Sequence, residues 1–543
     1  MSEANPPTER APASREAMGS GASAPTQGVT GFDTVAAAAR RWLAAEPDAD
    51  IREELQALID GDPAALGGRF SGILTFGTAG LRAAVGPGPL RMNRLVVRQA
   101  AAGLAAYLRS SDPRAAERGV VIGYDVRRKS EVFAQDTARV MAAAGVRVML
   151  LPDPLPTPVL AWSITELDAT AGVMVTASHN PPTDNGYKVY LGDGAQIVPP
   201  HDAAIADQIA LVDPIDVPLA DADDGLITML DDGVTAAYLA SIADVRVRPD
   251  VPGVRVAYTP LHGVGGDTAC TAFELAGFDR PAVVDEQFEP DGTFPTVSFP
   301  NPEEPGAMDL LLALADASGA DLAIANDPDA DRLGAAIPQP DGSWRRLGGD
   351  EIGWLLADHI LANTTGDDRL VITTLVSSSL LGALAKSYGV HVKETYTGFK
   401  WIARTILDHP DLRFVFGYEQ ALGYLVAPRP LDKDGISAAL MLTEVASVAA
   451  AEGTTMQQRL DEIAARFGRH VTIDKAVRMD PVAAARAVER LQAQPPKEIG
   501  GAAVIDVVAF PEADLLRFEL AGGVRVQVRP SGTEPKVKIY GEA

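Results

Sequence analysis

One pattern occurs three times along this chain and limits the folds that the chain can adopt. In each copy, an apolar run rich in β-branched residues ends in a small or polar loop, and a stretch with helical periodicity follows. The copies begin at Arg118, Gly253 and Arg369. Each copy predicts a strand, a loop and a helix. Together they predict three related α/β domains whose strand ends carry loops, unless common β–α units resemble one another here by chance.

The chain length and the C-terminal region indicate further organisation. A chain of 543 residues exceeds what a single core usually supports. From Asp480, a helical segment is followed by the short strand-like runs GAAVIDVVAF and GGVRVQVRP, which predicts a smaller α+β domain. The N-terminal segment is rich in Pro, Ser, Ala and Gly, which predicts disorder. We expect a disordered tail over 1–37, domains over 38–212, 213–338, 339–452 and 453–543, and a linker near 450–455.

Charge and cysteine content narrow the classes of partner. The chain has 47 basic and 73 acidic residues, a formal net charge of −26. Such a well-solvated acidic surface repels nucleic acid and anionic membranes, so an anionic substrate needs a local basic cluster. The single cysteine, Cys270, cannot form an intrachain disulfide, which favours a reducing compartment. No segment is typical of a signal peptide or a membrane span, and we expect a soluble, cytoplasmic protein without nucleic-acid or membrane partners.

The segment VMVTASHNPPTDNGYK places polar residues where an apolar run ends. The run predicts a buried strand, and Ser178 follows at the tip of the turn. Open α/β sheets bind ligands at such strand ends. His179 adjoins the serine, and Lys188 follows ten residues later. On local evidence alone, a polar turn without chemistry remains an alternative.

Three aspartates follow another apolar run at alternate positions. Asp327, Asp329 and Asp331 can converge on a hard cation such as Mg²⁺. A calcium EF-hand loop needs glycine at its sixth position and glutamate at its twelfth, where this chain has Arg332 and Pro338. The spacing therefore argues against an EF-hand, while an acidic surface turn without metal stays open.

A basic loop near the C-terminus, VRPSGTEPKVKIY, is the third element with a chemical signature. Hydroxyls, backbone N–H groups around a glycine and two cations can form a phosphate cradle, although a plain β-turn is the alternative. Its candidate ligands are Arg529, Ser531, Gly532, Thr533 and Lys536.

Three weaker loops complete the set of candidates. Lys400 in YTGFKW and Glu419 in FGYEQALGY suit a polyhydroxy anion. The glycine-rich segment FGTAGLRAAVGPG contains Thr78 and Arg82, which are compatible with phosphate contact. That segment lacks the P-loop lysine and the G-x-G-x-x-G spacing, which argues against nucleotide-binding folds.

The motifs TASHNP, DPDADR, GYEQALG and RPSGTEPK occur here in the order found in the α-D-phosphohexomutases. The chain resembles this family of phosphoglucomutases and phosphomannomutases from about residue 38 to 543, and is most similar to phosphoglucomutases. The resemblance implies an α/β fold with three similar mixed α/β domains and a smaller C-terminal α+β domain around a central cleft.

The resemblance also implies a role for each motif. Ser178 is then the phosphorylated serine, next to Mg²⁺ held by Asp327, Asp329 and Asp331. His179 and Lys188 match acid/base and substrate-contacting positions. The remaining matches are substrate-binding residues Thr78, Arg82, Arg332, Thr397, Gly398, Lys400, Glu419 and Lys433, and phosphate-binding residues Arg529, Ser531, Gly532, Thr533 and Lys536.

The chain departs from the family pattern in two loops. Ala421 stands where many members have a serine, which removes a hydroxyl contact and leaves the sugar preference open. The metal loop begins DPD rather than the more frequent DGD, a change compatible with metal binding because only the aspartate side chains need to converge. The segment TGFKW resembles phosphoglucomutase and phosphopentomutase-like members more than members with histidine in that loop.

The implied activity is interconversion of hexose 1-phosphate and 6-phosphate, most simply of α-D-glucose. It would use a phosphoserine enzyme, Mg²⁺ and bound glucose 1,6-bisphosphate as intermediate and activator. Phosphomannomutase and phosphopentomutase activities are alternatives within the family. A phosphoserine phosphatase would admit water and has no need of the anchor around Arg529, and a non-catalytic sensor would show a damaged serine or metal loop. We expect a monomer or weak homodimer.

Overall fold

The computed structural model describes residues 32–75, 80–530 and 536–543. Its strands form four sheets, and the three predicted strand–loop–helix units are present. They are β2 (Val120–Tyr124) with α6 (Ser130–Ala143), β7 (Val256–Thr259) with α10 (Gly266–Leu275), and β12 (Arg369–Thr374) with α14 (Leu380–Ser387). Every residue of these three strands is buried, which is why each reads as a continuous apolar run. The predicted α/β fold class is confirmed.

The first domain has a six-stranded mixed sheet in the order β1-β5-β4-β2-β3-β6. Strands β4, β2, β3 and β6 run parallel; at one edge β5 pairs antiparallel to β4, and β1 pairs antiparallel to β5. Its other elements are α1 (Phe32–Ala45), α2 (Ala49–Gly61), α3 (Pro63–Phe70), β1 (Leu81–Ala84), α4 (Arg94–Ser111), α5 (Ala115–Arg118), β3 (Val148–Leu150), α7 (Thr157–Glu166), β4 (Ala171–Val175), β5 (Asp184–Leu191), α8 (His201–Ala210) and β6 (Ile227–Met229).

The second and third domains repeat this mixed plan with fewer strands. Their sheet orders are β11-β10-β9-β7-β8 and β13-β12-β14-β15. The second domain adds α9 (Gly233–Ile242), β8 (Ala282–Val283), α11 (Asp285–Phe288), α12 (Asp309–Ser318), β9 (Leu322–Asn326), β10 (Leu333–Pro338) and β11 (Trp344–Arg346). The third adds α13 (Gly349–Asn363), β13 (His391–Thr395), α15 (Phe399–Asp408), β14 (Arg413–Glu419), β15 (Gly423–Leu425), α16 (Gly435–Ala451) and α17 (Met456–Phe467).

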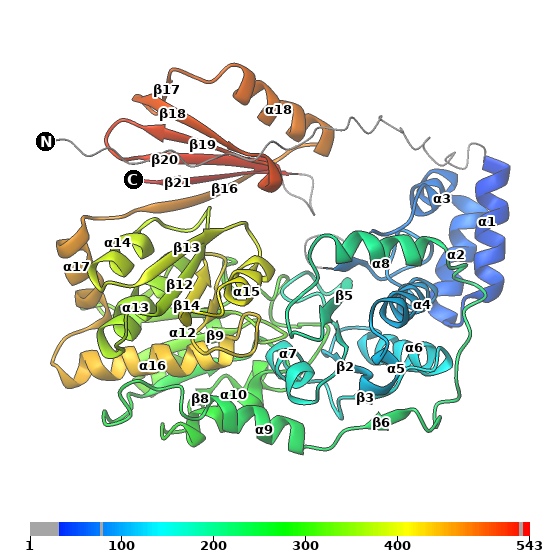
Figure 1. Ribbon diagram of the computed structural model, residues 1–543, viewed down its shortest axis with the longest axis horizontal. Coiled ribbons are helices and arrows are strands. Elements are labelled where there is room, and N and C mark those ends of the chain that lie inside the picture. The colour runs from blue at the N-terminus through cyan, green and yellow to red at the C-terminus, as the bar shows by residue number, and fades with distance from the viewer. Residues whose placement is uncertain (1–31, 76–79, 531–535) are drawn as a thin grey trace, which may run out of the picture.

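The fourth domain is an antiparallel sheet in the order β16-β21-β20-β19-β18-β17, packed against one long helix. It lies above the third domain in Figure 1. Buried and partly exposed residues alternate along β19, and the buried ones in this alternation pack with α18 in one hydrophobic cluster, as expected for a sheet with one covered side. The elements are β16 (Thr472–Arg478), α18 (Pro481–Ala493), β17 (Glu498–Ile499), β18 (Ala502–Phe510), the 3₁₀ turn η1 (Pro511–Ala513), β19 (Leu515–Leu520), β20 (Arg525–Pro530) and β21 (Lys536–Glu542).

Equivalent hairpins recur in the first three domains. In each, a strand that pairs in parallel with the first strand of the repeated unit turns into an antiparallel neighbour: β4 into β5, β9 into β10, and β14 into β15. The three turns carry the serine, aspartate and glutamate motifs. The fold therefore presents the three motifs at equivalent positions of three similar sheets.

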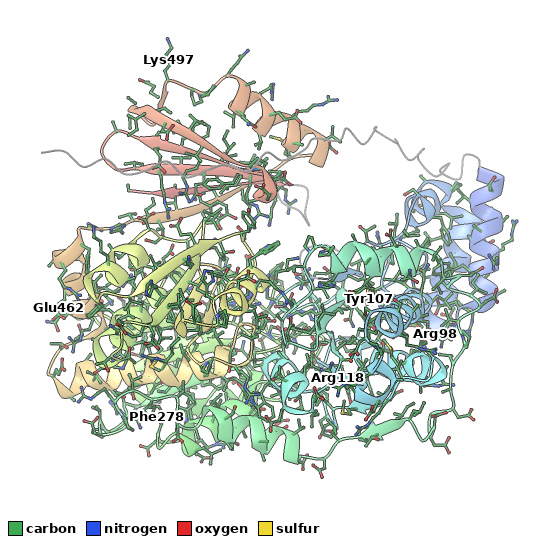
Figure 2. All side chains as sticks on the ribbon, viewed as in Figure 1. Arg98, Tyr107, Arg118, Phe278, Glu462 and Lys497 are labelled. Carbon is green, nitrogen blue, oxygen red and sulfur yellow. The ribbon has the colours of Figure 1, made fainter. Side chains whose placement is uncertain are left out.

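The hydrophobic cores explain how the domains are held together. One cluster of buried side chains runs through the second and third domains and includes Val159 and Trp162 of α7. The first and fourth domains have cores of their own. Figure 2 shows side chains filling the space between the sheets and helices of the first three domains. The second and third domains thus behave as one packed body, with the first docked through α7.

The structure differs from the sequence prediction at several boundaries. Residues 32–37, assigned to the tail, belong to α1. Strand β6, beyond the predicted boundary at 212, pairs with β3 of the first sheet. Helix α17, assigned to the fourth domain, packs in the core of the third through Met456, Leu460 and Ile463. The segment 452–455, near the predicted linker, connects α16 to α17. The other boundaries remain predictions.

The helices of the described residues were compared with the length and composition that a membrane span requires. None of them alone is long and apolar enough to cross a bilayer; the pair α16 and α17 passes by length and composition, with a bend of 89° between them. Helix α16 is buried from Gly435 to Ala449 by the surrounding domains. Its apolar composition is accounted for by that central position.

Candidate active site

A cleft of about 1220 Å³ is lined by residues of all four domains. The sequence-predicted residues that line it are Arg82, Ser178, His179, Lys188, Asp331, Arg332, Thr397, Gly398, Lys400, Glu419, Lys433, Arg529 and Lys536. Asp327 and Asp329 lie fully buried next to this surface. Thr78, Ser531, Gly532 and Thr533 fall outside the described residues. The structure thus gathers every described candidate in or beside one cleft.

Ser178 sits at the tip of the β4–β5 hairpin with a positive φ of 51°. Its hydroxyl donates a hydrogen bond to Asp327 Oδ2 at 2.8 Å, and His179 Nδ1 lies 3.2 Å from the same hydroxyl oxygen. The side chain is nearly buried, yet the residue lines the cleft. The hydroxyl therefore lies directly beside the acidic triplet, although the two motifs are 149 positions apart in the chain.

The three aspartates lie in the β9–β10 turn, and one carboxylate oxygen from each lies within 4.8 Å of the others. All three residues are fully buried. Asp329 Oδ1 and Asp331 Oδ1 accept no hydrogen bond from any described residue. Buried carboxylate oxygens without partners are costly unless a cation or water satisfies them. The donor set, all oxygen and convergent, fits Mg²⁺.

Two lysines balance much of the triplet's charge. Lys188 Nζ donates to Asp329 Oδ2 at 2.7 Å and to Asp331 Oδ2 at 2.9 Å, and Lys433 Nζ lies 3.2 Å from Asp331 Oδ2. Burial opposes ionisation, but these two ammonium groups hold the pKa of Asp331 well below its usual range. Burial, reinforced by its two acidic neighbours, raises the pKa of Asp327 well above its usual range.

Arg332 and His179 also lie close to the aspartate turn. Arg332 donates through its backbone N–H to Asp327 Oδ1 at 3.0 Å and through Nη1 to the carbonyl of Ala421 at 2.9 Å. It therefore ties the aspartate turn to the glutamate turn. Burial, with Arg332 and Arg82 nearby, lowers the pKa of His179 well below its usual range. The lowered pKa favours the neutral form of the imidazole.

The part of the cleft formed by the third domain suits a hydroxylated anion. Glu419 ends β14 and is nearly buried, and Lys433 packs beside Gly423 on the same turn. Thr397, Gly398 and Lys400 approach from the start of α15. Burial lowers the pKa of Lys400. Ala421 contributes its carbonyl to Arg332 rather than a side-chain hydroxyl to the cleft.

The fourth domain supplies a separate group of cations. Arg529 at the end of β20 and Lys536 at the start of β21 line the cleft, together with Arg478 and Lys538. The sequence analysis missed Lys538, although the two-residue period of a strand places it on the same face as Lys536. It also missed Thr157, whose hydroxyl donates to Asp329 Oδ2 at 2.7 Å from α7. No pattern near Thr157 signals that contact.

The cleft combines a serine hydroxyl, three aspartates that could hold a metal ion, and a second group of cations from the fourth domain. This combination is typical of a phosphoryl-transfer enzyme. Comparison with known proteins is more specific. Four family models, described as phosphoglucomutase/phosphomannomutase alpha/beta/alpha domains I, II and III and C-terminal domain, match residues 74–214, 236–342, 348–467 and 475–543. The chain belongs to the phosphoglucomutase/phosphomannomutase family, a group within the α-D-phosphohexomutases, and hence to a mutase class of isomerases.

Individual relatives support the same assignment. The chain is 44% identical over 464 residues to a probable phosphomannomutase of Haemophilus influenzae, covering 83% of this chain and 93% of that protein. It is 34% identical over 554 residues to the phosphopentomutase of Homo sapiens, covering 92% and 90%. The crystal structure of a putative phosphomannomutase from Thermus thermophilus matches with a TM-score of 0.68 and 25% identity, covering 87% of this chain and 95% of that one.

Proposed function

We propose that this chain interconverts hexose 1-phosphate and hexose 6-phosphate through a phosphorylated Ser178 and a bound sugar 1,6-bisphosphate. The observation that carries the proposal is the 2.8 Å hydrogen bond from Ser178 Oγ to Asp327, in a cleft that the fourth-domain cations Arg529 and Lys536 also line. A phosphate carrier needs one phosphoryl site. A substrate with phosphate at either end also needs an anchor for the end that does not react.

The chemistry follows from this division of the cleft. A phosphoserine carries about −1.5 to −2 charges near neutral pH, and these must be offset before the phosphoryl group can move. Mg²⁺ held by Ser178, Asp327, Asp329 and Asp331 would offset charge on the transferring group. Lys188 and Arg332 add fixed positive charge beside the same position.

Each half-reaction exchanges one P–O bond for another. In the first, the bond between phosphorus and Ser178 Oγ breaks, a bond to the free sugar hydroxyl forms, and the proton of that hydroxyl leaves while Ser178 Oγ regains one. We assign the transfer of these protons to His179, whose Nδ1 lies 3.2 Å from Ser178 Oγ, and to Lys188, which lies beside the aspartate turn. The bisphosphate then turns around and returns its other phosphate to Ser178. Glu419 and Lys433 would hold the sugar hydroxyls, and the Arg529 region would hold the non-reacting phosphate.

The sugar is proposed as α-D-glucose, with glucose 1,6-bisphosphate as activator. Mannose and pentose phosphates are the second candidates because the relatives are named phosphomannomutase and phosphopentomutase. The test incubates purified protein with Mg²⁺, a trace of the matching bisphosphate, and glucose, mannose or ribose 1-phosphate. The largest kcat/KM identifies the substrate. Release of free phosphate would instead indicate a phosphatase, and the absence of any product would indicate a sensor.

Two further properties belong to the proposal. The buried Cys270 is the only cysteine of the sequence, which supports a reducing compartment such as the cytoplasm. We also propose a monomer or a weak homodimer, since described residues from all four domains of a single chain line the cleft. Size-exclusion chromatography with light scattering tests the second property.

A further inference from the structure

A wholly buried arginine lies behind the Ser178 turn and has no part in the mechanism above. Arg127 follows β2, and neither it nor Asp125 lines the cleft. Its guanidinium donates to the carbonyls of Pro181 at 2.9 Å and Asn180 at 2.7 Å, and also to the carbonyl of Ser178 itself. Its partners in this turn are thus backbone oxygens. A planar fork of donors can hold several carbonyls in one fixed arrangement, which a lysine cannot do.

Asp125 holds the other side of the same serine. Its Oδ2 accepts a hydrogen bond from Thr176 Oγ1 at 2.6 Å, and Thr176 Oγ1 accepts one from the Ser178 N–H at 2.8 Å. Asp125 Oδ2 also lies 3.2 Å from Arg127 Nε, with both side chains fully buried. A single ion pair therefore fixes the peptide groups on both sides of Ser178. Asp125 holds the N–H of Ser178 through Thr176, and Arg127 holds its carbonyl directly.

The conformation of Ser178 explains why such support is needed. A φ of 51° is in the left-handed region, which is unfavourable for a non-glycine residue. Such a conformation persists only where the surroundings over-determine it. In this conformation Oγ lies 2.8 Å from Asp327 Oδ2. Relaxation of the turn to ordinary φ values would carry the hydroxyl away from the aspartate.

The second domain closes over this unit. The ring of Phe294 lies 5.0 Å from the guanidinium carbon of Arg127 and is itself buried. A Cβ added to Gly292 would lie 2.3 Å from the carbonyl oxygen of Val126, so the two backbones are in close contact. The guanidinium is thereby shielded from water, which strengthens its hydrogen bonds to the serine turn.

We propose that Asp125 and Arg127 form a positioning pair that holds Ser178 in its left-handed conformation, with the hydroxyl aimed at the metal triplet. The proposal rests on the proposed function for its effect on turnover, but not for its effect on the turn. Neither residue lines the cleft, so the pair acts on the site through the Ser178 turn.

Two matched pairs of variants test this proposal. R127K keeps the positive charge but loses the planar set of guanidinium donors. R369K is the control: it makes the same change at a buried arginine away from the cleft, whose guanidinium also donates to backbone carbonyls, those of Gly366, Leu361, Thr364 and Tyr388. T176V removes the bridging hydroxyl, and T176S is the conservative variant that keeps it. Kinetics, thermal unfolding and amide hydrogen exchange of residues 176–186 are measured for all four.

We expect kcat to fall about 100-fold in R127K, the loss typical of a misplacement of ~1 Å, with KM within about threefold of the wild type. T176V should lose kcat in the same way, and T176S should recover it. Exchange in 176–186 should accelerate in R127K and T176V. R369K should lower the unfolding temperature without either effect.

Each outcome decides the question. Equal kcat in R127K and R369K at equal loss of stability, or equal kcat in T176V and T176S, would overturn the positioning role. If the wild type turns over no phosphosugar, the proposed function fails, and the exchange data alone decide. Faster exchange in R127K and T176V, but not in R369K, then supports the pair, and unchanged exchange refutes it.

Discussion

Gly263 offers a direct way to move the aspartate turn without changing any charged residue. It lies in the loop between β7 and α10, against the backbone of Pro328 between Asp327 and Asp329. A Cβ at this position would lie 2.4 Å from Pro328 Cα and 2.5 Å from its carbonyl oxygen. Ordinary van der Waals contact begins at 3.4 Å, so Gly263→Ala requires a separation of 3.4 − 2.4 = 1.0 Å. The obstacle is backbone, which cannot rotate away.

The consequence for the metal site follows from this distance. Metal ligands tolerate errors of about 0.2 Å, and a shift of ~1 Å at a reacting centre typically costs about 100-fold in rate. Overpacking also lowers stability by about 1–3 kcal/mol. We therefore expect Gly263→Ala to raise the Mg²⁺ concentration for half-maximal activity by about tenfold or more and to lower kcat by about 100-fold.

The assay is turnover as a function of Mg²⁺ concentration, combined with urea unfolding. Gly382→Ala is the matched control, because a Cβ added to Gly382 in α14 would meet no atom within 4 Å beyond the neighbouring backbone of its own helix. This control should gain roughly 0.5–1 kcal/mol of stability from helix propensity and keep its Mg²⁺ dependence. Wild-type kcat and Mg²⁺ dependence in Gly263→Ala would refute the argument that this loop fixes the aspartates.

Three further predictions concern single side chains. Ser178→Ala should abolish turnover with an unchanged unfolding temperature, and near-normal rates in a steady-state assay would exclude the carrier role. Asp329→Asn should weaken Mg²⁺ activation by about tenfold or more in a titration of activity, since a charged oxygen ligand is lost. Burial raises the pKa of Glu46 from 4.5 to about 7, so between these values the folded state binds a proton that the unfolded state has lost. As the pH rises through this window, the free energy of unfolding of the wild type should therefore fall by about 3 kcal/mol relative to that of Glu46→Gln. Urea unfolding at about pH 4.5 and pH 8 measures this change, and a difference between the two proteins that does not depend on pH would contradict the assignment.

The predictable part of the fold depends on local patterns. The buried strands β2, β7 and β12 are recognisable because a strand covered on both faces is a continuous apolar run. Strand β6 escaped assignment to the first sheet because it has only three residues, Ile227–Met229, and two of them are exposed. Helix α17 looks like the start of a new segment because a short turn separates it from α16. Its packing through Met456, Leu460 and Ile463 places it in the third domain.

The sequence by itself determined which residues carry chemical potential: a serine after one apolar run, alternating aspartates after another, and a basic loop in an acidic chain. Periodicity and turn composition report the local backbone, so they could locate these groups but not their distances. Only the tertiary structure decided that Ser178 meets Asp327, that Thr157 and Lys188 share Asp329, and that Arg127 supports the serine turn from behind. The contacts of Asp327 and Asp329 arise from the docking of separate cores, and Arg127 reaches the serine turn because β2 and β4 are neighbours in one sheet. Both kinds of pairing join residues far apart in the chain and leave no periodic trace in it.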